Sequence, residues 1–136
     1  MRFIALDVHR DFCEGPLKSA LSGLLIEFES GPVIGVNRIQ PESRQRFTIG
    51  HELGHYLLRH HDYFHIDLGV PAADRDPPGY DWRRERQANE FAANVLMPAA
   101  WVRERFLAGR SVPQLLSDFD VSPIAMGYRL TNLGLR

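Results

Sequence analysis

Hydrophobic and polar residues follow two different patterns along the chain, and the change between them lies near residue 40. Before this point, residues 24–29 and 33–37 are short runs of β-favouring side chains. Ser30-Gly31-Pro32 joins them and supplies the turn dihedrals, so this region predicts a β-hairpin. Beyond it, apolar residues recur at helical spacing, and prolines and serines stand where they begin helices. The helices predicted from these signals span about 41–59, 82–97, 98–107, 113–119 and 123–133.

The order of these elements predicts an α+β fold, with a small N-terminal β-hairpin or sheet followed by a bundle of four to five helices. Residues 66–80 contain three prolines and two glycines, which predicts a surface loop between the first two helices. A chain of 136 residues suffices for one domain with a sizeable core. We therefore expect a single domain over residues 1–136. Its parts are a strand-rich region (about 1–40), two helices with their loop (41–97) and C-terminal helices (98–136).

The composition of the chain limits the binding partners and the cellular compartment that we expect for it. The chain has 16 basic and 17 acidic residues, so no strong overall field draws it to nucleic acid or to an anionic membrane. Cys13 is the only cysteine, which excludes an intrachain disulfide and favours a reducing compartment. No stretch approaches the roughly 20 apolar residues that cross a bilayer, and charged residues interrupt the N-terminal run. These features predict a cytoplasmic protein without a membrane partner.

The segment His51-Glu52-Leu53-Gly54-His55 lies within the first predicted helix. Side chains four residues apart share one helix face, so His51 and His55 can aim at one metal ion. Glu52 stands beside them, where it can act as general base on a water that Zn²⁺ makes more acidic. The pentapeptide also occurs by chance on solvated helices. Here, however, apolar residues flank it and predict a buried helix, in which these polar groups need a partner such as a metal.

A catalytic zinc usually has three protein ligands, so a third is expected from another element. Glu85 and Glu90, both on the second predicted helix, compete for this place. On a helical wheel, Glu85 falls about 50° from the centre of the apolar stripe, whereas Glu90 lies nearly opposite it. Glu85 is therefore predicted to face the histidines. The residues that define the stripe are Ala88, Phe91, Ala92, Val95 and Leu96.

Other polar residues near these helices have more than one interpretation. Asn89 could hydrogen-bond a ligand histidine from outside the metal shell, or be an ordinary exposed residue. Asp81 is a rival third ligand, although a helix N-cap is favoured for it. The small side chains of Ala88 and Ala92 would allow the two helices to approach closely. Five further residues between the helices could line a cleft, and none is assigned a catalytic role: His60, His61, Tyr63, His65 and Tyr80.

The chain resembles the ImmA/IrrE family of metallopeptidases, which are of the gluzincin kind. The resemblance lies in residues 44–58 (RQRFTIGHELGHYLL), 85–98 (ERQANEFAANVLMP) and an ending that includes 119–122 (FDVS). It implies Zn²⁺ as cofactor, Glu85 as third ligand and a regulatory peptidase. The substrate it implies is a helix-turn-helix transcriptional repressor whose cleavage releases stress or mobile-element genes. Gly50 departs from the usual alanine, and the region before residue 24 matches only loosely.

Two alternatives from other functional classes remain open. The helix pair 111–119 and 122–133 has the proportions of a DNA-binding helix-turn-helix. Arg129 is the only base in its second helix, however, so structural packing is favoured and no direct contact with nucleic acid is expected. The other alternative is a zinc-held, non-catalytic or toxin-like partner of a helix-turn-helix protein.

Overall fold

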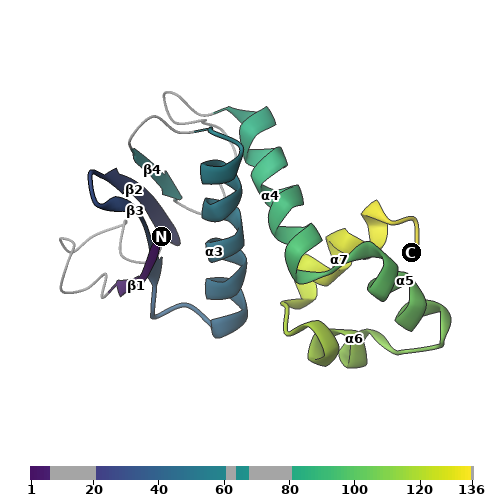
Figure 1. Cartoon of the computed structure of the whole chain (residues 1–136). Helices are drawn as coiled ribbons and strands as arrows, with labels where there is room; N and C mark the ends of the chain where they lie inside the picture. Colours follow the sequence, from purple (N-terminus) through teal and green to yellow (C-terminus); the bar gives the residue numbers. More distant parts are fainter. Residues whose placement is uncertain (7–20, 61–63, 68–80, 136) are drawn as a thin grey trace, which may run out of the picture.

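The computed structural model describes residues 1–6, 21–60, 64–67 and 81–135. Within them, four strands form one sheet in the order β1-β3-β2-β4 (Figure 1). Strand β2 runs antiparallel to both β3 and β4, whereas β1 runs parallel to β3. The strands are β1 (Arg2–Leu6), β2 (Gly23–Phe28), β3 (Gly31–Asn37) and β4 (Phe64–Asp67).

The predicted hairpin is confirmed, since β2 and β3 pair from Phe28 opposite Gly31 along their length. Gly31 has a positive φ of 120°, which explains why a glycine stands at this turn. Strand β4 corrects the predicted loop over 66–80, because Ile66 and Asp67 pair with β2. A four-residue strand that pairs with a partner forty residues earlier leaves no local signal. The remainder of that predicted loop lies outside the described residues.

All five predicted helices are present, with ends within two residues of the prediction. Asp81 caps α4 by accepting hydrogen bonds from the backbone N–H groups of Arg83 and Arg84, as its favoured interpretation predicts. Ser111 and Gln114 form a capping box at the start of α6. None of the described helices is long and apolar enough to span a bilayer. The helices are α3 (Glu42–Leu57), α4 (Trp82–Leu96), α5 (Ala99–Leu107), α6 (Val112–Phe119) and α7 (Pro123–Asn132).

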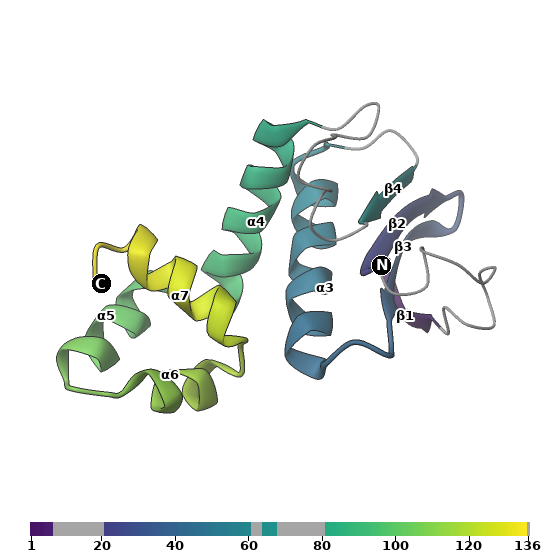
Figure 2. The same ribbon diagram turned by 180° about the vertical axis from the view of Figure 1, so that it is seen from behind.

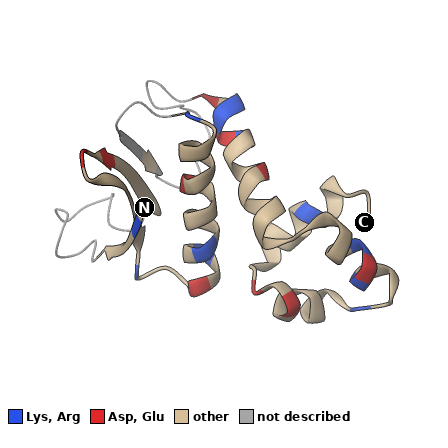
Figure 3. Cartoon of the chain, viewed as in Figure 1, with Lys and Arg blue, Asp and Glu red and all other residues tan. Residues whose placement is uncertain are grey.

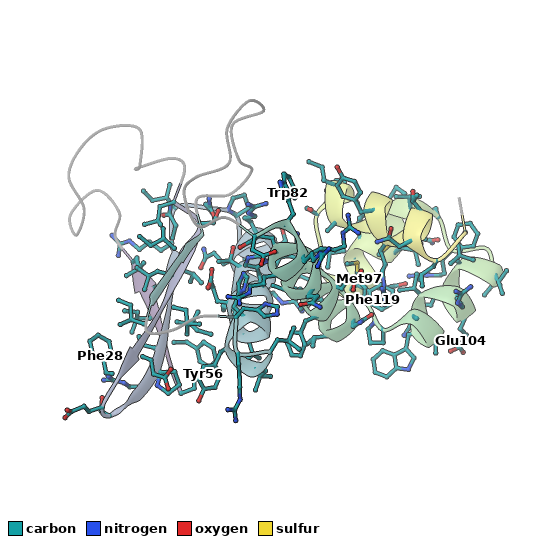
Figure 4. The ribbon with its side chains drawn as sticks, turned by 90° about the horizontal axis from the view of Figure 1, so that it is seen from above. Phe28, Tyr56, Trp82, Met97, Glu104 and Phe119 are labelled. Atoms are coloured by element: carbon teal, nitrogen blue, oxygen red, sulfur yellow. The ribbon has the colours of Figure 1, made fainter. Side chains whose placement is uncertain are left out.

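Helix α3 lies between the sheet and α4, as the two opposite views show (Figures 1 and 2). One face of α3 packs apolar residues, Tyr56 among them, on buried Leu25 and Ile34 of the sheet. The other side meets α4 along its length. This layering, an α+β fold as predicted, places the central residues of α3 away from water. Figure 4 shows Tyr56 between α3 and the sheet.

The end of α4 belongs to a second apolar cluster, which α5, α6 and α7 complete. Met97 and Phe119 lie in this cluster and are labelled in Figure 4. Arg46 of α3 reaches the same region, because its guanidinium donates to the carbonyl oxygens of Phe119 (3.1 Å) and Asp120 (2.5 Å). The C-terminal helices are thus attached to both α3 and α4.

Arg129 of α7 is buried in this arrangement, with 7% of its surface exposed. Its Nε donates to the carbonyl oxygen of Met97 (2.9 Å), and its Nη2 donates to Oδ1 of Asn94 (3.0 Å). Burial lowers the pKa of this guanidinium, and Arg103 adds repulsion, yet an arginine stays protonated. The only base of α7 therefore stabilises the fold and is unavailable to DNA phosphates. Figure 3 shows basic and acidic segments interspersed over the other elements.

Replacing Arg129 by methionine is expected to lower the free energy of unfolding by about 1.5–3 kcal/mol, the usual effect of losing hydrogen bonds to a charged group. Methionine keeps much of the apolar stem while it leaves the Met97 carbonyl without this donor. Urea unfolding measures the change. The exposed Arg103→Met is the matched control, with an expected change within roughly 0.5 kcal/mol. Equal losses in both variants would contradict this account of Arg129.

Candidate metal centre

His51 and His55 lie one turn apart on α3 and are buried, with 4% and 1% of their surfaces exposed. Their Nε2 atoms are 3.1 Å from each other, and the two rings meet edge to face. Such proximity follows from the helical spacing of four residues, which places both side chains on the same side of the axis. The pair therefore presents two nitrogen atoms to one point.

Glu85, in the first turn of α4, supplies a carboxylate at the same point. Its Oε2 lies 3.0 Å from Nε2 of His51, and its Oε1 lies 3.2 Å from Nε2 of His55. Glu90 is exposed. The orientations of both glutamates agree with the helical-wheel pattern. The three side chains form a group that could hold a metal ion.

The spacing and chemistry of this group fit one small divalent cation. Ligand atoms at 2.0–2.1 Å from a tetrahedral zinc lie roughly 3.3 Å from one another, close to the 3.0–3.2 Å separations found here. Two imidazoles with one carboxylate are also a common donor set in catalytic zinc sites, where the fourth position stays open. The residues present therefore suit a metal that retains room for a water or a substrate oxygen.

Asn89 lies one turn after Glu85 on α4 and contacts the outer side of His51. Its Oδ1 is 2.8 Å from Nδ1 of His51. Because a carbonyl oxygen can only accept, Nδ1 must carry the proton in this hydrogen bond. In the neutral imidazole Nε2 then keeps its lone pair, which is the tautomer a metal ligand requires. Asn89 is an exposed residue that makes this hydrogen bond, and its role as the outer partner of a metal ligand stays a prediction.

Glu52 follows His51 and points from α3 toward the sheet. It is fully buried, with 0% of its surface exposed. A Cβ added at Gly23 of β2 would lie 3.7 Å from Glu52 Cγ and would collide with Cγ2 of Thr48. A glycine at this position thus leaves room for Thr48, whereas Glu52 lies at ordinary van der Waals distance from it. The sequence pattern missed Gly23, because its contact with Thr48 joins two elements that lie far apart in the chain.

Among the five other residues named from the sequence, His60 is the one whose side chain the structure describes. Its ring lies beside that of His55. The side chains of the remaining four lie outside the described part of the chain: His61, Tyr63, His65 and Tyr80. Their assignment to a cleft stays a prediction.

The model of the Peptidase_M78 family, described as the IrrE N-terminal-like domain, matches residues 12–131. This match covers most of the chain and includes both helices of the candidate metal centre. The chain belongs to the Peptidase_M78 family. The resemblance to ImmA/IrrE proteins is thereby confirmed. Comparisons with curated proteins and with solved structures give no match.

Membership in Peptidase_M78 indicates a peptidase, and a peptidase implies a protein substrate. The group formed by His51, His55 and Glu85 is consistent with the metal that such an enzyme would use. The coarse function thus follows from the family, whereas the metal, the reaction steps and the substrate need separate argument.

The geometry of the candidate metal centre in this Peptidase_M78 chain depends on how closely α3 approaches α4. A Cβ added at Gly50 would lie 3.0 Å from Cβ of Ala92, and one added at Gly54 would lie 3.2 Å from Cα of Ala88. Both separations are shorter than ordinary van der Waals contact. Glycines on α3 facing alanines on α4 therefore set the distance at which Glu85 meets the histidines. This packing also favours a glycine at position 50.

Gly54→Val is expected to push α4 away from α3 and to weaken Zn²⁺ binding by at least about 10-fold, since misplaced ligands and outer-shell partners have effects of this size. Competition with a chromogenic chelator measures the affinity. Leu57→Val introduces the same β-branched residue at an exposed position of α3 and should leave the affinity unchanged. If both variants bind Zn²⁺ equally, the close contact does not position the ligands.

Proposed function

We propose that this chain is a zinc-dependent endopeptidase, in which His51, His55 and Glu85 hold the metal and Glu52 is the general base. The observation that carries the proposal is the convergence of two Nε2 atoms and one carboxylate within 3.0–3.2 Å, on two helices that pack through glycine and alanine. Side chains from positions as distant as 51 and 85 meet here at metal-ligand spacing. This convergence is more specific evidence for a metal site than the pentapeptide alone.

Bound zinc supplies Lewis-acid chemistry, which polarises a peptide carbonyl and makes a water molecule more acidic. The chain's own residues supply the proton transfers and the geometry. The Glu52 carboxylate takes a proton from the attacking water and returns it to the amine nitrogen that leaves when the C–N bond breaks. The Asn89 carbonyl fixes His51 with Nε2 directed inward.

The proposed substrate is a helix-turn-helix transcriptional repressor, cleaved at an internal peptide bond. Its support is the family resemblance, since repressor cleavage is typical of ImmA/IrrE proteins. A repressor acts where the chromosome is, so the proposed place of action is the cytoplasm. A role in stress response or in the regulation of transcription belongs to the same proposal.

Neither alternative function gains support from the described residues. The exposed face of α7 presents Ile124 and Tyr128, and its only base, Arg129, is buried, so this helix offers little to a DNA backbone. A non-catalytic zinc-held partner would have the same metal ligands. It differs from a peptidase in needing no general base at position 52.

The substitution Glu52→Gln therefore distinguishes a peptidase from a non-catalytic zinc-held partner. The variant should keep its bound zinc and lose peptidase activity by about 10²–10⁴-fold, the usual contribution of a general base. Zinc-loaded protein is added to a lysate of the source organism, and new protein N-termini are identified by mass spectrometry. Wild type and the exposed control Glu90→Gln should produce the same new N-termini, including one within a helix-turn-helix protein.

Three results would each contradict one part of the proposal. Absence of zinc from the purified wild type after metal loading would contradict the proposed metal site. Undiminished cleavage by the Glu52→Gln variant would contradict the assignment of Glu52 as the general base. Cleavage confined to proteins of other classes would agree with the proposed peptidase activity but contradict a helix-turn-helix repressor as its substrate.

A further inference from the structure

The chain reverses at the end of α3 in a turn that brings His60 back over the last helical residues. The N–H of Arg59 donates to the carbonyl of Tyr56 (3.1 Å), and the N–H of His60 donates to the carbonyl of His55 (2.9 Å). Arg59 has a left-handed φ of 57°. This combination is the Schellman motif, which folds the residue after the left-handed one against the preceding turn.

The turn places the ring of His60 beside the ring of His55. Their Nδ1 atoms are 3.3 Å apart, and the ring centroids are 5.4 Å apart with the planes inclined by 68°. From the other side, Nη1 of Arg84 donates to the carbonyl oxygen of His60 (2.9 Å). His60 is thus held by the end of α3 and by the first turn of α4, the same turn that carries Glu85.

The two nitrogens of His55 face different partners. Nε2 faces His51 and Glu85, whereas Nδ1 faces His60. A neutral imidazole that gives the lone pair of Nε2 to a metal carries its proton on Nδ1. That proton needs an acceptor, and the Nδ1 atom of His60 lies at hydrogen-bonding distance. His60 then carries its own proton on Nε2.

We propose that His60 is a positioning residue for the candidate metal centre: it accepts the hydrogen bond from Nδ1 of His55 and so fixes the tautomer and ring orientation of that ligand. The inference rests on the proposed metal site. It gives His55 an outer partner equivalent to the one Asn89 gives His51, so that each histidine is oriented from outside the site. The alternative, a histidine that only complements the end of the helix dipole, needs no contact with His55.

Two substitutions separate hydrogen bonding from packing. His60→Asn keeps an acceptor near the position of Nδ1 but removes the ring, whereas His60→Phe keeps a ring of similar shape but has no acceptor. The affinity for Zn²⁺, measured by chelator competition, should fall about 10–100-fold in His60→Phe, as expected for the loss of an outer-shell partner. It should stay within a few-fold of wild type in His60→Asn. The visible spectrum of Co²⁺-loaded protein should change in the phenylalanine variant alone.

Leu58→Ala, in the same turn and exposed, is the control for general disturbance and should bind Zn²⁺ as wild type does. Wild-type affinity in His60→Phe, or equal losses in both His60 variants, would overturn the assigned hydrogen bond while leaving the metal site in place. Failure of the wild type itself to bind Zn²⁺ would overturn the metal site instead. The two failures are therefore distinguishable.

Discussion

The packing of α3 against α4 is the contact on which the other features depend. Gly50 and Gly54 face Ala88 and Ala92, and a single added methyl group at either glycine would meet α4 at about 3.0–3.2 Å. Protein interiors are close-packed and respond to changes of this size. The short side chains allow the two helices to meet where Glu85 can reach the histidines of the neighbouring helix. Longer side chains at these positions would separate the carboxylate from its partners.

The same two helices connect the site to the rest of the molecule. Helix α3 lies on the sheet, where Gly23 leaves space for the buried Thr48, and α4 continues into the C-terminal cluster around Met97. Hydrogen bonds from the buried Arg129 to the end of α4 fix it from the far side. The polar residues of the site are thus supported by apolar packing on both sides, which limits how far they can move apart. Such rigidity suits a site whose groups must keep a fixed geometry.

Much of this arrangement was predictable from the sequence, because local patterns carry it. Proline, serine and aspartate at helix starts predicted all five helices, and the apolar stripe of the second helix directed Glu85 inward and Glu90 outward. Other contacts, made between strands, between a strand and a helix or in a turn, were not predictable. Strand β4 and the fit of Gly23 against Thr48 depend on pairings whose partners lie far apart in the chain. The contact of His60 with His55 depends on the left-handed conformation of Arg59, which an arginine rarely adopts.

The most direct test of the central claim is anomalous X-ray diffraction from crystals of the zinc-loaded protein, recorded on both sides of the zinc absorption edge. The account predicts an anomalous peak bounded by Nε2 of His51, Nε2 of His55 and the carboxylate of Glu85, with α3 and α4 in the contact described above. A zinc peak bound to other residues would contradict it. So would the absence of any peak between these three side chains at full zinc loading.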